Sequence, residues 1–305
     1  MRYRIEYILF QFIKLVILAL PLRSAQRFGC YLGSTVFHLS PRRREVALDN
    51  LRHAFPEKPD RERYEIAKGS FQNYGIALVE LLWFPNLNEE RLEKLLHPKN
   101  FDTLLEAHAR GKGLIVLSGH FGNWELIAFG MAHLAKIPFT IIVQKQNNLM
   151  VDRVINEHRC LLGNKVVAMG LSIREIIRTL QDKGVVAIAP DQSGDREGGI
   201  YIEFFGRKVS THQGPAAFAL RSGAPVEMGF LIRRQDGTYD VIIEEVPFGD
   251  LKGYSEENVY ELTRRHLAVL EAYIRRYPDH WMWMHRRWKH VEIEEKIETS
   301  EYAGA

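Results

Sequence analysis

The stretch Gly113-Leu114-Ile115-Val116-Leu117-Ser118-Gly119-His120-Phe121-Gly122-Asn123-Trp124-Glu125 decides the fold of this chain. Its apolar start is typical of a buried strand, and the run from Leu126 to Ala135 that follows is typical of a helix. Gly119 and Gly122 permit a tight bend between the two, and Asn123 is a suitable N-cap for the helix. Open α/β sheets place their chemistry at such strand-to-helix corners.

His120 and Glu125 are the two residues of this corner that we expect to carry chemistry. Because they are five apart, they meet only if His120 lies in the loop and Glu125 in the first turn of the helix. The positive helix end would favour an ionised Glu125, which could hold the imidazole and stabilise its protonated form. This predicts a histidine base with a carboxylate that orients it. The alternative is a satisfied loop histidine and an ordinary helix-start carboxylate.

Short apolar runs alternate with helical segments through much of the chain, which predicts an α/β fold with a mixed, mostly parallel sheet flanked by helices. Residues 1 to about 95 are expected to be helical. The predicted strands are Leu114–Leu117, Phe139–Val143, Val166–Ala168, Val185–Ala189, Val226–Arg233 and Tyr239–Val246, with a strand or hairpin at 200–209. The predicted helices include Arg23–Leu39, Asp60–Phe84, Asn100–Arg110, Trp124–Ala135, Asn148–Leu162, Ser172–Lys183, His212–Ser222 and Glu256–Arg276.

Composition narrows the class of protein. The chain has 305 residues, of which 46% are hydrophobic, so it can bury a sizeable core. Its net charge of +3 is too balanced for a general nucleic-acid binder. The two cysteines, Cys30 and Cys160, form neither a metal-binding spacing nor a disulfide framework, which fits a reducing, cytosol-facing environment.

The N-terminal segment from Tyr7 to Leu20 is almost entirely apolar. As a helix it would reach only about 21 Å, against about 30 Å for a bilayer core. Arg4, Gln11 and Lys14 fall near one stripe, so we predict a membrane-embedded or interfacial anchor helix rather than a signal peptide or a buried core helix. The predicted parts are membrane-anchoring helices at 1–39, an α/β domain at 40–290 and an acidic, flexible tail at 291–305.

Several common chemistries lack their motifs in this sequence. There is no G-x-S-x-G elbow, no H-E-x-x-H zinc motif, no Walker loop and no G-x-G-x-x-G fingerprint. A histidine base without a protein nucleophile would activate a hydroxyl on a bound substrate. Direct group transfer without a metal is therefore the predicted reaction type.

Residues 119–125, G-H-F-G-N-W-E, resemble the H-x4-D/E motif of the lysophospholipid acyltransferase superfamily, and more closely that of the bacterial late lipid A acyltransferases of the lauroyl and myristoyl type. Other blocks that resemble this family occur in its order: Arg42-Arg43-Arg44 with Asn50-Leu51 and Phe55-Pro56; Gln146-Asn147-Asn148 with Asp152 and Arg159; Ala189-Pro190-Asp191-Gln192 with Phe204-Phe205-Gly206 and Thr211; and Pro278, Trp281-Met282-Trp283-Met284-His285 and Arg287-Trp288-Lys289. Together they cover roughly residues 1 to 290. At Gln144-Lys145 the sequence departs from the arginine expected of this family.

The resemblance implies a cytoplasmic-side enzyme of the cell inner membrane that needs no cofactor. The donor would be an acyl-acyl-carrier-protein or acyl-CoA, and the acceptor a hydroxyl of a lipid A precursor at the membrane surface. His120 would be the base and Glu125 its partner. The residues expected to bind substrate are Asn147, Asn148, Arg159, Asp191 and Gln192. Arg159 would stabilise an oxyanion or bind a lipid phosphate, and Asp191-Gln192 would bind substrate or brace the site.

Three alternatives remain open at this point. The acceptor could be a phosphatidylinositol mannoside, an ornithine lipid or a lysophospholipid; the chain could bind lipid or carrier protein without catalysis; or it could hydrolyse the thioester. An acidic carrier would suit a basic surface such as Arg42–Arg44 or Arg264-Arg265 with Arg275-Arg276. Trp281, Trp283 and Trp288 interleave with basic residues, which indicates nucleic-acid stacking, a membrane-interface belt or a plain cover over the sheet.

Overall fold

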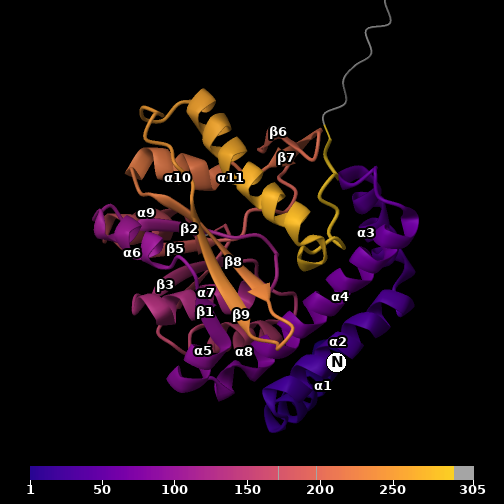
Figure 1. Cartoon of the computed structure of the whole chain (residues 1–305). Coiled ribbons are helices and arrows are strands. Elements are labelled where there is room, and N and C mark those ends of the chain that lie inside the picture. The colour runs from indigo at the N-terminus through magenta and orange to yellow at the C-terminus, as the bar shows by residue number, and fades with distance from the viewer. Residues whose placement is uncertain (171, 197, 292–305) are drawn as a thin grey trace, which may run out of the picture.

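A seven-stranded sheet forms the centre of the computed structural model, which describes residues 1–170, 172–196 and 198–291 (Figure 1). The strand order is β1-β9-β8-β2-β5-β3-β4, and all neighbours are parallel except β8 and β9. The strands of this sheet are β1 (Leu96–Pro98), β2 (Leu114–Leu117), β3 (Phe139–Val143), β4 (Lys165–Ala168), β5 (Val185–Ile188), β8 (Val226–Arg233) and β9 (Tyr239–Glu245). The predicted α/β class with a mixed, mostly parallel sheet is confirmed.

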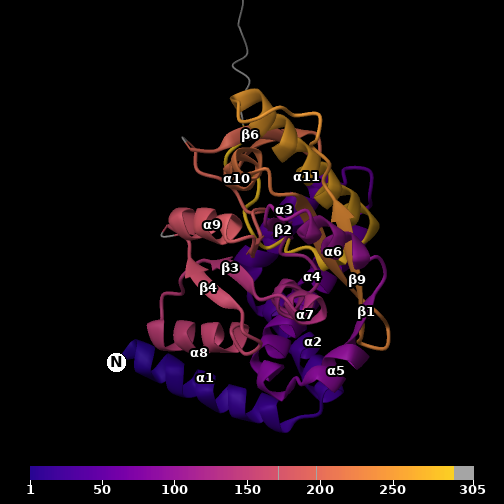
Figure 2. The same ribbon diagram turned by 90° about the vertical axis from the view of Figure 1, so that its left-hand side faces the viewer.

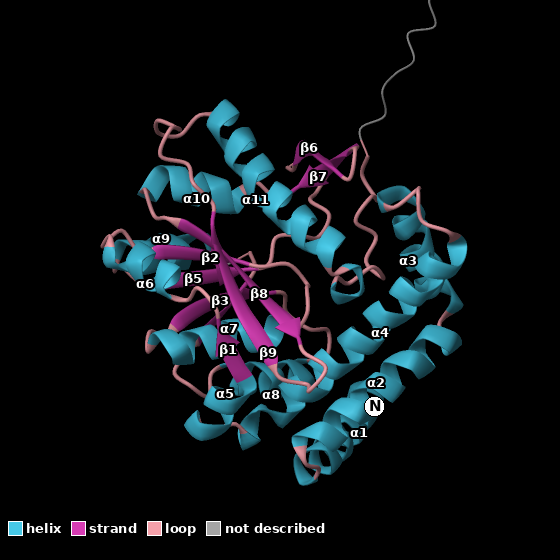
Figure 3. Cartoon of the chain, viewed as in Figure 1, coloured by secondary structure: helices cyan, strands magenta, loops and turns pink. Residues whose placement is uncertain are grey.

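Helices cover both faces of the sheet (Figure 3). Their bounds are α1 (Arg2–Ala19), α2 (Leu22–Leu39), α3 (Pro41–Ala54), α4 (Asp60–Trp83), α5 (Glu89–Leu95), α6 (Asp102–Ala109), α7 (Trp124–Ala135), α8 (Leu149–Arg159), α9 (Ser172–Gln181), α10 (Gly214–Ser222) and α11 (Glu256–Arg276). Strand β2 shows why two cores form: Ile115 and Leu117 belong to the core under α9, α10 and α11, whereas Leu114 and Val116 belong to the core under α6 and α7.

Most predicted elements agree with these bounds to within a few residues. Strand β1 was not predicted, because three residues ending in Pro98 carry no period-2 pattern and are ordered only by pairing with β9. The 200–209 segment is a hairpin of β6 (Ile200–Phe204) and β7 (Arg207–Thr211), which forms its own two-stranded sheet. The predicted acidic tail falls almost wholly on 292–305, which lie outside the described residues.

The N-terminal helices lie against the body of the molecule. Helices α2 and α4 pack side by side (Figure 1). Gly33 allows this close approach, since a Cβ there would lie 2.1 Å from the carbonyl oxygen of Phe71. Helix α1 lies along α8 (Figure 2) and also contacts α4. Within the described residues, no helix has both the length and the apolar character needed to cross a membrane. The division of the chain at residue 39 stays a prediction.

The tryptophans of the C-terminal segment form a buried cluster. Trp281, Trp283 and Trp288 are all less than a tenth exposed, and the rings of Trp283 and Trp288 are nearly parallel. They pack on Phe204 and Phe205 of the β6–β7 hairpin. A membrane-interface belt and nucleic-acid stacking are therefore both wrong for these residues, because buried rings cannot meet either partner. The plain cover is confirmed.

Candidate active site

His120 and Asp191 lie at equivalent points of two adjacent parallel strands. His120 follows the end of β2 by three residues, and Asp191 follows the end of β5 by three. These strands are paired in register, with Leu117 opposite Ile188. Because the carboxyl ends of adjacent parallel strands meet at one sheet edge, the two side chains face each other.

Asp191 holds both the backbone and the ring of His120. Its Oδ1 lies 2.7 Å from the imidazole Nδ1, and its Oδ2 accepts the His120 backbone N–H at 2.8 Å. The Trp281 indole N–H donates to the same Oδ2 at 2.8 Å. A carboxylate at this distance places the ring proton on Nδ1 and leaves Nε2 as an acceptor. The His120 side chain is 21% exposed, and the Gln192 amide nitrogen lies 3.3 Å from Nε2.

The charges around the ring favour its protonated form. Burial alone would lower the pKa of His120, but the charge of Asp191 and its hydrogen bond outweigh burial, so the pKa is raised above its usual value. Glu125 adds to this increase through space, and Arg159 opposes it. Asp191 is buried, which would raise its pKa, yet the facing imidazole and the hydrogen bonds lower it to about 2. The pair is therefore built to take up a proton at Nε2 and to stabilise the resulting imidazolium.

The sequence led us to expect that Glu125 holds the imidazole, but in this structure it does not. Its carboxylate pairs with Arg159 of α8, with Oε2 2.8 Å from Nε and Oε1 2.6 Å from Nη2. The orienting hydrogen bond belongs to Asp191 instead. The reason is geometric: Glu125 lies in the first turn of α7 and points toward α8, whereas His120 lies in the loop before it. The bracing role considered for Asp191 is thus observed.

Gly122 sets the bend of the loop. Its φ is +57°, and a Cβ there would lie 2.1 Å from the Leu231 carbonyl oxygen. Its N–H donates to the His280 carbonyl at 2.8 Å, and the Met282 N–H donates to the His120 carbonyl at 3.0 Å. The loop that presents the imidazole is therefore held by backbone contacts on both sides.

Replacing Gly122 with alanine should lower the free energy of unfolding by about 2–4 kcal/mol, because strain and a clash add. Gly206 offers a matched control, since its φ is +71° and a Cβ added there would meet nothing within 4 Å. Gly206→Ala should cost only about 1 kcal/mol. Urea unfolding of both variants measures this, and equal losses would show that the close contact at Gly122 is unimportant.

Comparison with known proteins shows the family of the chain. The family described as bacterial lipid A biosynthesis acyltransferase matches residues 1–290. The chain belongs to this family. It is 28% identical over 269 residues to the lipid A biosynthesis palmitoleoyltransferase of Escherichia coli, covering 85% of this chain and 84% of the relative. It is 25% identical to the lauroyltransferase of the same organism, covering 90% and 88%. A phosphatidylinositol mannoside acyltransferase of Mycolicibacterium smegmatis is 23% identical, covering 73% and 72%. This chain is accordingly an acyltransferase.

The Glu125–Arg159 pair of this acyltransferase is almost buried, each side chain being 11% exposed. Arg159→Met should lower the free energy of unfolding by about 3 kcal/mol, because it leaves a buried carboxylate unpaired. The double variant Glu125→Gln with Arg159→Met should regain part of that loss in urea unfolding. A double variant as unstable as the single one would contradict a role of charge pairing here.

The remaining predicted substrate residues of the acyltransferase have different surroundings. Asn148 is buried: its Oδ1 caps α8 by accepting the Met150 N–H, and its amide donates to the Tyr3 carbonyl and to Glu6 of α1. It ties α1 to α8, so this structure gives it no free group for substrate. Asn147, its neighbour, is exposed. Of the predicted set, the structure brings together His120, Asp191 and Gln192, and it pairs Glu125 with Arg159.

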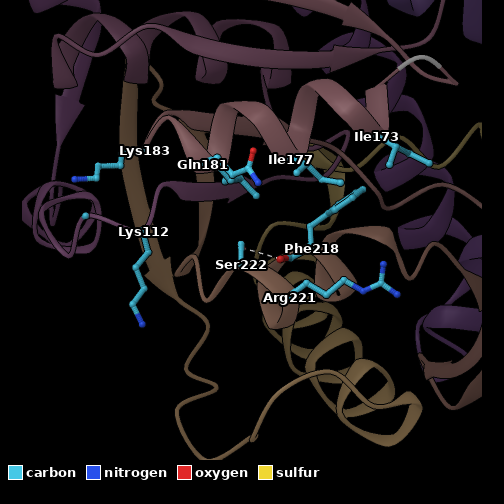
Figure 4. Close-up of a pocket in the computed structure, with 10 residues that line it drawn as sticks. Lys112, Ile173, Ile177, Gln181, Lys183, Phe218, Arg221 and Ser222 are labelled. Atoms are coloured by element: carbon cyan, nitrogen blue, oxygen red, sulfur yellow. Dashed lines mark hydrogen bonds between the residues drawn. The ribbon is translucent and has the colours of Figure 1, made fainter.

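A cavity of about 450 Å³ lies between α9 and α10, where Phe218 points toward Ile173 and Ile177 (Figure 4). Lys112 and Lys183, which also line it, belong to the turns before β2 and β5. The cavity therefore reaches the sheet edge opposite His120, and none of the predicted site residues lines it.

Proposed function

We propose that this acyltransferase moves a fatty acyl group from an acyl thioester to a hydroxyl of a lipid A precursor, with His120 as general base. The observation that carries the proposal is the His120 imidazole, whose Nδ1 lies 2.7 Å from Asp191 Oδ1 and whose side chain is 21% exposed beyond the carboxyl end of β2; this pairing leaves Nε2 as the acceptor. A base so oriented takes a proton from a hydroxyl.

The proposed reaction is a direct transfer in two steps. Nε2 of His120 takes the proton from the acceptor hydroxyl as that oxygen attacks the thioester carbonyl carbon, giving a tetrahedral oxyanion and an imidazolium. The oxyanion then collapses, the carbon–sulfur bond breaks, and the imidazolium returns the proton to the leaving thiolate. The products are an ester and a free thiol, and no acyl-enzyme forms.

Glu125 contributes to this scheme by its charge. It raises the pKa of His120 through space while its oxygens bond Arg159, so it favours the imidazolium without touching the ring. The Arg159 guanidinium is bonded to Glu125 and Asn156. In the proposal it stabilises the oxyanion or binds a phosphate of the lipid, in line with the substrate role predicted for it.

An acyl-carrier protein is the proposed donor partner, with acyl-CoA as the alternative. In the second basic surface suggested by the sequence, three of the four arginines are paired: Arg264 and Arg265 pair with Glu261, Arg265 also pairs with Asp250, and Arg275 pairs with Glu271. At Arg42–Arg44, the described residues show no ion pair; Arg43 instead donates to the Met284 carbonyl. Met284 is in the segment that also bonds His120. This surface therefore suits an acidic carrier close to the site.

Helix α1 supports the proposed association with a membrane surface. Several of its apolar side chains face outward, with Ile8 67% and Phe12 64% exposed, whereas Ile17 is buried against the body of the protein. Its polar residues Gln11 and Lys14 are partly buried instead. A helix with polar groups toward the protein and apolar groups toward solvent is suited to lie in the acyl–headgroup boundary of a membrane.

Phe12→Glu should weaken binding to lipid vesicles about tenfold or more, because it removes a large apolar contact and adds a charge. Tyr260→Glu is the control, since Tyr260 is also exposed but lies on α11. Vesicle co-sedimentation compares the two. Equal binding by the Phe12 variant and the native chain would contradict membrane docking through α1.

One other acceptor is favoured by a specific observation, the likeness to a phosphatidylinositol mannoside acyltransferase. The test is an assay with labelled acyl donor, on carrier protein or CoA, against lipid A precursor, phosphatidylinositol mannoside and lysophospholipid. The proposal expects label in the lipid A precursor. Label only in another lipid would overturn the acceptor, and acyl release as free acid with every acceptor would indicate hydrolysis.

A further inference from the structure

A buried carboxylate lies behind the loop that carries His120. Glu80, near the end of α4, is 3% exposed. Its Oε1 accepts the Gln26 amide at 2.6 Å, and its Oε2 accepts the Tyr239 hydroxyl at 2.6 Å and the Asn123 amide. These donors come from α2, from β9 and from Asn123, the N-cap residue of α7. Glu80 thus joins three parts of the fold with one side chain.

The donors around Glu80 are neutral. Among the described residues, the charged group that bonds into this network is Arg233, whose Nε donates to the Tyr239 hydroxyl at 3.0 Å rather than to Glu80. A buried charge without a direct ion pair is costly, and an apolar side chain would often serve stability as well. However, the three hydrogen-bond donors that point at residue 80 need a side chain that only accepts, and the Glu80 carboxylate is such a group.

Asn123 connects this carboxylate to the loop. It is fully buried and uses both ends of its amide: Oδ1 accepts the Leu126 N–H at 2.9 Å to cap α7, and Nδ2 donates to Glu80. Glu80 therefore fixes which way the amide points, and with it the start of α7.

The loop is then held at both ends. Asp191 holds the backbone N–H of His120, and Glu80 holds Asn123 three residues later. Gly122, between them, has a positive φ and is itself bonded to His280. Glu125 follows two residues after Asn123, in the first turn of α7. A shift of Asn123 would therefore displace both His120 and Glu125.

We propose that Glu80 is a positioning residue that acts through Asn123 to fix the loop presenting Nε2 of His120. This inference rests on the proposed role of His120 as base. Glu80 touches no substrate in this account. Its contribution is to the rate of the chemical step, since small displacements of a base can cost about 100-fold.

The test compares Glu80→Gln with Tyr239→Phe. Both remove one polar interaction from the same buried network, but only the first alters the group that holds Asn123. Glu80→Gln should lower kcat about 10- to 100-fold with KM for the donor unchanged, whereas Tyr239→Phe should leave kcat within about threefold. Asn123→Asp should also lose activity, because it sets two buried carboxylates against each other. Glu80→Gln combined with Asn123→Asp restores a donor–acceptor pair and should regain most of kcat.

Hydrogen exchange of residues 118–128 gives a readout that needs no activity. Exchange there should rise in Glu80→Gln and return toward the native rate in the double variant, while Tyr239→Phe should leave it unchanged. Equal effects of Glu80→Gln and Tyr239→Phe on kcat and on this exchange would overturn the inference. Absence of transferase activity in the native chain would instead overturn the proposed function, and the exchange data would still decide the role of Glu80.

Discussion

Alanine in place of His120 should lower kcat for acyl transfer by about 10²- to 10⁴-fold. The His120 side chain is partly exposed, and its Nε2 is the atom of the described site that we propose takes the proton. Without it the acceptor hydroxyl must lose its proton to water, and no base is positioned to do so. Initial rates with a labelled acyl donor and lipid A precursor measure the loss.

His133→Ala is the matched control, because His133 lies on the adjoining helix α7, far along from the loop, and is partly exposed. It should retain the native rate. Both variants should remain folded at the assay temperature by circular dichroism, which shows that the loss in His120→Ala is chemical, although His120→Ala should unfold at a lower temperature because the buried Asp191 loses a partner. A His120→Ala variant with native kcat would remove the histidine from the mechanism.

The second large effect should come from Asp191→Asn, with kcat reduced on the order of 10³-fold. An asparagine amide can present a donor to Nδ1, which places the ring proton on Nε2 and blocks the base. The buried Asp191 carboxylate also keeps the pKa of His120 above its usual value. The pKa of His120 that governs the residual activity of the variant should therefore be lower than in the native enzyme.

The His120–Asp191 pair also determines the direction in which kcat/KM changes with pH. Activity needs unprotonated Nε2, so kcat/KM of the native enzyme should fall on acidification with an apparent pKa above the usual 6.5 of histidine. In Asp191→Asn this acid limb should move to lower pH. Gln192→Ala, which removes only the amide near Nε2, should leave the limb in place. An acid limb at the same pH in native enzyme and Asp191→Asn would contradict the pairing.

The architecture was predictable because its signals are local. Short apolar runs between amphipathic segments define βαβ units, and the corner around His120 follows from one strand, two glycines and an N-cap. The order of the strands is set by tertiary packing, so the adjacency of β2 and β5 was not available from the sequence. This is why Asp191 was expected to bind substrate or brace the site but was not recognised as the residue that orients His120.

The other misassignments have equally specific causes. Glu125 is five residues from His120, and the helix turns its side chain toward Arg159. Interleaved tryptophans and basic residues look alike whether they face a membrane or fold inward, and here they fold inward. Glu80 was not singled out, although a single carboxylate within the apolar run Ile76-Ala77-Leu78-Val79-Glu80-Leu81-Leu82-Trp83 is the signal that could have found it.

Mass spectrometry of lipid A tests the central claim most directly. Cells that lack the native enzyme would be complemented with the native chain or with His120→Ala, and their lipid A compared for acyl number and chain length. The account predicts one additional ester-linked acyl chain with the native chain and none with His120→Ala. Lipid A that is identical in the two strains, or an added chain that survives the loss of His120, would contradict it.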